Sequence, residues 1–241
     1  MQLSPLNQRR FNNFKSNKRG WYSFWIFSFL FLISIFADFI ANDKPLLVRY
    51  DNAFYLPIIN EYPETIFGGD FETEADYRDP FVKKLINSNG WIIMPIIPYS
   101  YNTIIRDLNV PAPAPPSQKN WLGTDDQARD VLARLIYGFR ISILFGFTLT
   151  FFSMIIGVSA GAVQGYFGGK TDLFFQRFME IWSAIPALYV LIILASIVQP
   201  NFWWLLIILL IFSWMGYVGV VRAEFLRARN FDYVRAAKAL G

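Results

Sequence analysis

Four stretches of this sequence carry no charged residue over about the length that a helix needs to cross a lipid bilayer, roughly 20 residues. Hydrocarbon offers no hydrogen-bond partners to backbone N–H and C=O groups, so segments that cross it form helices or closed barrels. With 54% hydrophobic residues, the chain is also too apolar for a typical soluble domain. We therefore predict an all-α polytopic membrane protein with four transmembrane helices, over residues 21–41, 141–163, 181–198 and 202–221, with a tight turn over residues 199–201 between the last two.

The charged residues are sorted between the segments that flank these stretches. Residues 1–20 contain five basic residues and no acidic one, and residues 222–241 contain five basic and two acidic residues. Residues 42–136 contain thirteen acidic and nine basic residues. Lys and Arg accumulate on the cytoplasmic side of membrane proteins. We expect a multi-pass membrane protein with both ends in the cytoplasm, contacting lipid and not nucleic acid.

Asp38 lies near the outer end of the first predicted helix and ends its uncharged part. A carboxylate inside the membrane can mark an ion path. A carboxylate at the boundary can instead belong to a hydrated helix end. We favour the second interpretation, because Asp38 is so close to the end of the span.

The segment of residues 42–136 predicts a mixed, loop-rich extracytoplasmic region between the first and second helices. It is rich in aromatic and acidic residues and is broken into short pieces by prolines. The patterns predict a hairpin of strands 46–50 and 53–56 around Asp51-Asn52, a helix over 75–89, a strand over 91–97 and a stiff extended linker over 111–116.

Several kinds of chemistry are excluded by the residues that the sequence lacks. It has no Cys, hence no disulfide framework, and no His, the commonest general base and metal ligand. It also has no glycine-rich phosphate loop ending in Lys-Ser or Lys-Thr. We therefore predict no catalytic residue, no metal site and no cofactor bound by this chain.

Glycines recur every four residues in the second predicted helix, at Gly157, Gly161 and Gly165. Because four residues make just over one helical turn, these glycines form one stripe. Small-residue stripes allow transmembrane backbones to approach closely. The stripe predicts close helix packing, either within this chain or against a partner subunit.

The segment before the second predicted helix has a recognisable helix start. Thr124 followed three residues later by Gln127 is the pattern of a capping box, so we predict that a helix begins at Thr124. Arg129 and Arg134 are then expected near the membrane surface, where three acidic residues are available as partners. These are Asp125, Asp126 and Asp130.

The same segment resembles the signature of dipeptide and oligopeptide ABC-importer permeases of the C-subunit type. The shared residues are Gly123, Thr124, Asp125, Arg129, Asp130, Val131, Arg134, Tyr137, Gly138, Arg140 and Ser142. Ala128 departs from the pattern, since the family usually has Gly there. Further along, residues 165–169, Asp172, Arg177, Glu180 and Pro186 also match the family pattern. Pro186 is expected to kink the third helix.

The last ten residues resemble the EAA loop of these permeases, the cytoplasmic helix that couples the permease to its ATPase. Ala236, Ala237 and Gly241 match the motif, and Arg235 stands in place of its leading Glu. The resemblance implies that these four residues contact the ATPase. The alternative is an ordinary helix on the membrane surface.

The resemblance implies a function for the whole chain. It implies the membrane-spanning subunit of an ATP-driven importer for short peptides or peptide-like compounds in the bacterial inner membrane. Residues 137–241 would be the permease core and residues 222–241 the coupling loop. The implied partners are a second permease subunit in a heterodimer, an ATP-binding cassette ATPase that binds ATP and Mg, and an extracytoplasmic peptide-binding protein. The substrate-binding residues are left unassigned.

The extracytoplasmic insertion, and within the chain residues 42–50 and 199–204, resemble the YejE-type subgroup, which is associated with short peptides and microcin C. Members of the family have about six spans, so we expect that this sequence is truncated at the EAA loop. A rival interpretation is a membrane-anchored extracytoplasmic sensor or assembly factor, in which residues 42–136 carry the function. A sensor would need neither the coupling loop nor the glycine stripe.

Overall fold

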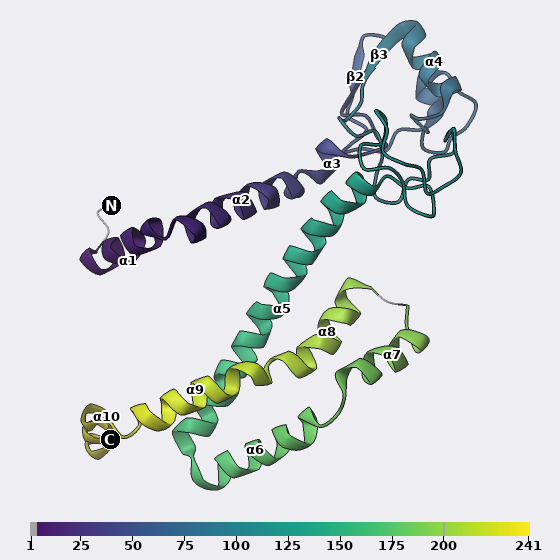
Figure 1. Cartoon of the computed structure of the whole chain (residues 1–241). Coiled ribbons are helices and arrows are strands. Elements are labelled where there is room, and N and C mark those ends of the chain that lie inside the picture. Colours follow the sequence, from purple (N-terminus) through teal and green to yellow (C-terminus); the bar gives the residue numbers. More distant parts are fainter. Residues whose placement is uncertain (1–3, 200) are drawn as a thin grey trace. The chain divides into compact units, whose positions relative to one another are not determined.

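The computed structural model describes residues 4–199 and 201–241, and the chain divides into two compact units, Met1–Ser142 and Ile143–Gly241 (Figure 1). Helix α5, Val131–Phe167, begins in the first unit and ends in the second. The first unit combines helices with a small sheet, whereas the regular elements of the second unit are helices throughout its described part.

Three helices open the first unit: α1 (Pro5–Ser16), α2 (Lys18–Ile35) and α3 (Ala37–Ile40). Asn17 caps α2, because its side-chain oxygen accepts a hydrogen bond from the backbone N–H of Gly20 at 3.2 Å. Phe36 separates α2 from α3. The segment predicted as the first span is therefore interrupted once near its end.

The predicted hairpin is confirmed. Strands β1 (Leu47–Tyr50) and β2 (Ala53–Tyr55) pair antiparallel, and Asp51 and Asn52 between them have φ of 47° and 62°. Two consecutive left-handed residues form the turn that fits the twist of a two-residue hairpin. Strand β3 (Gly90–Ile93) pairs antiparallel with the other edge of β1, which gives the sheet order β2-β1-β3.

A short 3-10 helix, η1 (Glu64–Phe67), and helix α4 (Pro80–Asn89) cover this sheet. The helix predicted over 75–89 starts later than expected, at Pro80. Asp79 caps its N-terminus, because its side chain accepts a hydrogen bond from the backbone N–H of Phe81 at 2.8 Å. The predicted strand over 91–97 ends early, at Ile93. The core here consists of Val48, Phe67, Ala75, Tyr77, Val82 and Ile86.

A second buried cluster in the first unit joins the two ends of the segment 42–130 with residues from its middle. It brings α3 and the residue after it, Ala41, against the start of α5. Its buried members are Ala37, Ala41, Ile97, Tyr99, Ile105, Ala133 and Tyr137. The end of the first apolar segment is thereby packed against the first turns of α5.

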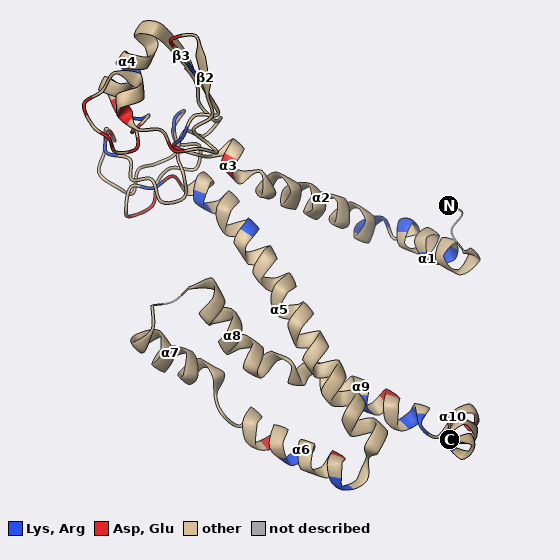
Figure 2. Ribbon diagram, turned by 180° about the vertical axis from the view of Figure 1, so that it is seen from behind, with Lys and Arg blue, Asp and Glu red and all other residues tan. Residues whose placement is uncertain are grey.

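The second unit continues with helices α6 (Gly169–Ser183), α7 (Ala187–Ile197), α8 (Phe202–Ser213), α9 (Met215–Ala228) and α10 (Asp232–Leu240). The middle of α5 and all of α7 and α8 carry no charged residue, whereas α6, α9 and α10 contain charged residues (Figure 2). The uncharged parts have the composition of membrane-spanning segments.

Two helical segments within the described residues are long and apolar enough to cross a membrane: α5, and residues 202–228. The count rises to three if α6 and α7, which are bent by 62°, form one span. The bend lies at Pro186, where the sequence predicts a kink. The chain is thus a helical membrane protein, while the count of four spans stays a prediction. The turn predicted over 199–201 includes Pro200, which lies outside the described residues.

The glycine stripe of α5 lies against the segment that contains α9. A Cβ atom built on Gly161 would lie 2.8 Å from the carbonyl oxygen of Val218 and 2.9 Å from the Cβ of Val221. Gly157 and Gly165 face residues one turn earlier and later along the same segment. Since such distances are too short for any side chain, the two backbones are in direct contact.

We predict that Gly161→Leu disrupts this contact, with a loss of stability of about 1–3 kcal/mol from overpacking. The matched control is Gly146→Leu, because Gly146 is on the same helix and a Cβ there meets nothing within 4 Å. The measurements are the yield of folded protein in membranes and thermal unfolding in detergent. Equal behaviour of the two variants would contradict the prediction.

Candidate functional site

The signature segment begins as a loop and not as a helix. The hydroxyl of Thr124 accepts a hydrogen bond from the N–H of Ala114 at 2.9 Å, and the N–H of Thr124 donates to the carbonyl of Ala114 at 3.0 Å. The predicted capping box at Thr124 is therefore wrong, because its hydroxyl pairs with the Pro-rich segment. Through Ala114, the predicted extended linker over 111–116 is hydrogen-bonded to the signature.

Asp130 is the residue that caps α5. Its Oδ1 accepts from the N–H of Ala133 at 2.8 Å, and its Oδ2 accepts from the side-chain amide of Asn120 at 2.8 Å. Asp130 is 1% exposed and Asn120 is 4% exposed, so both oxygens find partners inside the protein. The helix thus begins seven residues after the predicted start, and no sequence pattern pointed to Asn120 as a partner.

Asp125 pairs with both Arg129 and Arg134 of the signature. It forms ion pairs with Arg129, whose Nε lies 2.9 Å away, and with Arg134. Burial raises the pKa of the Asp125 carboxyl, but hydrogen bonds from the Arg129 side chain and from the backbone of Arg129 and Gln127 outweigh it and lower the pKa to about 2. Asp126, the other candidate partner, is exposed and has no ion pair in the part of the chain that the structure describes.

Ala128 stands in a left-handed backbone conformation, with φ of 60°. Its carbonyl accepts from the N–H of Ile105 at 2.9 Å, and its N–H donates to the carbonyl of Asp125 at 3.0 Å, which holds the conformation in place. Non-glycine residues rarely adopt such angles, because Cβ crowds the backbone. The family pattern that has Gly at this position matches what the backbone requires.

Tyr137 and Arg140 of the signature meet Asp38 from the end of the first apolar segment. Arg140 donates to Asp38 at 2.8 Å, and its guanidinium lies 4.9 Å from the centre of the Tyr137 ring. The Tyr137 hydroxyl is 2.8 Å from both Asp38 and the carbonyl of Ala41, and can donate to either. Asp38 is therefore an ion-pair partner, which neither of the two sequence-based interpretations included.

The other small signature residues have different surroundings. Gly123 has φ of 74° and passes close to Ala114, so a side chain there would be strained and crowded. A Cβ on Gly138 would meet nothing within 4 Å. The exposed face at Gly138 is free within the described chain.

In the second unit, Asp172 of α6 forms a bidentate ion pair with Arg222 of α9. Its two carboxylate oxygens accept from Nε and Nη2 of the guanidinium at 2.5 and 2.6 Å. Arg222 also lies where α9 passes Gly165 of α5. Planar, paired hydrogen bonds of this kind fix orientation as well as charge. The pair therefore joins three helices near one point.

The coupling residues predicted from the sequence lie on α10 or at its end. Arg235, Ala236, Ala237 and Gly241 are all exposed, and Gly241 has φ of 101°. Lys238 on the same helix lies 4.7 Å from the ring centre of Tyr166, close to the end of α5. A helix with exposed alanines can approach another surface closely.

Comparisons with known proteins show which family the chain belongs to. The description "Binding-protein-dependent transport system inner membrane component" matches residues 153–241, and "N-terminal TM domain of oligopeptide transport permease C" matches residues 4–58. The chain belongs to the family of binding-protein-dependent ABC transporter permeases. As a permease it is not an enzyme, and ATP hydrolysis takes place on a separate subunit.

The chain is 55% identical over 240 residues to the inner membrane ABC transporter permease protein YejE of Escherichia coli, covering 100% of this chain and 70% of the relative. It is 53% identical over 263 residues to the peptidoglycan transport system permease protein YejE of Agrobacterium fabrum, covering 99% and 69%. It is 34% identical over 142 residues to the dipeptide transport system permease protein DppC of Bacillus subtilis, covering 59% and 44%. The resemblance found in the sequence is confirmed.

We predict that Ala128→Gly stabilises the first unit by about 0.5–1 kcal/mol, because relief of the left-handed strain exceeds the entropic cost of glycine. The control is Ala53→Gly in β2, where the substitution should destabilise by about 0.5–1 kcal/mol. Thermal unfolding in detergent measures both. A loss of stability with Ala128→Gly would show that the strain is absent.

Proposed function

We propose that this chain is the membrane-spanning subunit of an ATP-driven importer for short peptides or peptide-like compounds, with residues 137–241 as its permease core. The observation that carries the proposal is the exposed Ala face of α10, next to a helix that is in backbone contact with α5. The names of relatives mention dipeptide, oligopeptide and peptidoglycan transport. Uptake of microcin C stays a prediction of the resemblance.

The proposed mechanism passes motion from the ATPase to the spans through residues 222–241. Arg235, Ala236, Ala237 and Gly241 would contact the ATPase. A displacement of α10 reaches α5 through Lys238 and Tyr166, and through the backbone contact of α9 with the glycine stripe. Packed helices have few stable arrangements, so such a push shifts the spans between inward- and outward-facing states.

The proposed topology has four spans and both ends in the cytoplasm, with α2 and α3 together as the first span. The matched N-terminal transmembrane description supports the first span, because it covers residues 4–58. The apolar helices and the permease relatives support an inner-membrane, multi-pass protein. The proposed partners are a second permease subunit, an ATPase that binds ATP and Mg, and a peptide-binding protein outside.

The rival function of a membrane-anchored sensor or assembly factor loses support from the relatives. The permease of Escherichia coli matches this chain over its full length, including the segment on which the sensor interpretation depended. Residues 42–136 are therefore part of a permease and need no separate function.

To test the coupling role, we predict that Ala237→Glu in the complete transporter abolishes peptide-stimulated ATP hydrolysis and reduces co-purification of the ATPase. A large, charged side chain adds bulk and a desolvation cost at the contact. The control is Ala239→Glu, because residues 237 and 239 lie about 200° apart around a helix. The measurement is ATPase activity of the reconstituted complex with and without binding protein and peptide. Full stimulation in the Ala237 variant would contradict a coupling role.

The topology is tested with single cysteines in a chain that has none. We predict that Ser88→Cys reacts with a membrane-impermeant thiol reagent on intact cells, and that Ser16→Cys reacts only after the cells are opened. Both side chains are exposed, so access is decided by the membrane. Labelling of the Ser16 variant on intact cells would rule out the proposed orientation.

A further inference from the structure

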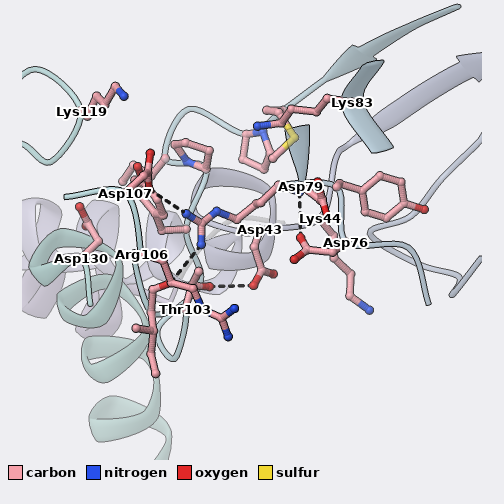
Figure 3. Close-up of a pocket in the computed structure, with 18 of the residues that line it drawn as sticks. Asp43, Lys44, Asp76, Asp79, Lys83, Thr103, Arg106, Asp107, Lys119 and Asp130 are labelled. Carbon is pink, nitrogen blue, oxygen red and sulfur yellow. Dashed lines mark hydrogen bonds and ion pairs between the residues drawn. The ribbon is translucent and has the colours of Figure 1, made fainter. Parts of the chain in front are cut away.

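A cavity of about 1200 Å³ lies within the first unit, between the start of α4, the segment of residues 94–99 that follows β3, and the loops of residues 102–121 (Figure 3). Pockets that hold drug-sized ligands have volumes of roughly 300–1000 Å³. The cavity therefore has room for several peptide residues. The structure and the comparisons assign no ligand to it.

The carboxylates that line the cavity are engaged within the protein. Asp43 accepts from the Thr103 hydroxyl at 2.7 Å, and Glu74 is paired with Lys44. The others have these partners: Asp76 the N–H of Arg78, Asp79 the N–H of Phe81, Asp107 the guanidinium of Arg78, and Asp130 Asn120 and Ala133. No lining carboxylate is left without a partner in the described residues.

Three of the cations that line the cavity have no such partner. Lys83, Arg106 and Lys119 are exposed and form no ion pair or hydrogen bond through their side chains within the described residues. Lys83 belongs to α4 and Lys119 to a loop on another wall (Figure 3). These three side chains are free to pair with an anion, in a lining that holds six acidic and five basic residues in all.

Large apolar side chains are exposed on the same cavity. Ile96, Ile104 and Trp121 are 72%, 56% and 57% exposed, although each is a residue that proteins usually bury. Apolar surface beside uncommitted cations suits a ligand that combines side chains with a carboxylate. A short peptide with a free C-terminus has this chemistry.

We propose that this cavity is a binding site for short peptides on the permease itself, in which Lys83, Arg106 and Lys119 attract the C-terminal carboxylate and the apolar residues contact the side chains. This inference rests on the proposed function in peptide import. It adds a peptide site on this chain, apart from the binding protein. Charge-assisted hydrogen bonds to a carboxylate are the strong ones, and they weaken with salt.

The first test measures binding of radiolabelled tetra-alanine to the chain in lipid nanodiscs, without the binding protein, by equilibrium dialysis. We expect saturable binding that weakens with salt. Tetra-alanine with a C-terminal amide should bind about tenfold more weakly or worse, because it lacks the carboxylate. This comparison uses the unchanged protein and so does not depend on the folding of a variant.

The second test uses charge reversal. Lys83→Glu and Lys119→Glu should each weaken tetra-alanine binding about tenfold or more. The matched control is Lys84→Glu, which alters the next residue of α4, exposed but outside the cavity lining, and should change binding by less than about twofold. Thermal unfolding confirms that each variant is folded.

Absence of saturable binding, equal binding of the amide, or an equal loss with Lys84→Glu would overturn the site. Loss of binding-protein capture by Lys83→Glu, without any tetra-alanine binding, would instead make the cavity a protein-docking surface and also overturn it. Peptide uptake by the complete transporter is measured separately. Uptake without tetra-alanine binding to the chain would leave the proposed import function standing while the cavity proposal fails.

Discussion

The second unit depends on the direct backbone contact between α5 and α9. Three glycines at intervals of four residues remove every side chain from one stripe of α5, and α9 fills that space. In a bilayer, where lipid tails are as apolar as Leu, close van der Waals packing of this kind holds helices together. The ion pair of Asp172 with Arg222 then fixes α6 at the same place. Helix α10 directly follows α9 in the chain, so its position depends on this contact.

Features that depend on short sequence patterns could be predicted. The hairpin follows from Asp51-Asn52 between two strand-forming runs, the bend follows from Pro186, and the glycine spacing indicated close packing. These patterns act over one or two turns of chain, so neighbouring residues decide the outcome. The similarity of residues 123–142 to the permease signature likewise indicated the family before any geometry was known.

Features that depend on distant partners could not be predicted. The pattern at Thr124 and Gln127 is typical of a helix start when it is taken alone. In the structure the Thr124 hydroxyl accepts a hydrogen bond from Ala114, and the helix is capped by Asp130 instead. The same reasoning missed Asn120 and assigned no partner to Asp38. The basic residues Lys83, Arg106 and Lys119, which line the cavity, come from separate segments of the chain. Their shared surroundings exist only once the loops have folded.

The pairing of Asp38 with Arg140 has a consequence for the order in which the chain matures. The two residues are 102 positions apart. At synthesis rates of about 5–20 residues per second, roughly 5–20 seconds separate the appearance of the carboxylate from that of its partner. During that interval Asp38 stands alone, and the whole of the loop-rich segment between them emerges. Arg140 follows this segment in the chain, so the ion pair forms only after the whole segment has been synthesised. Its formation then joins the end of the first apolar segment to α5.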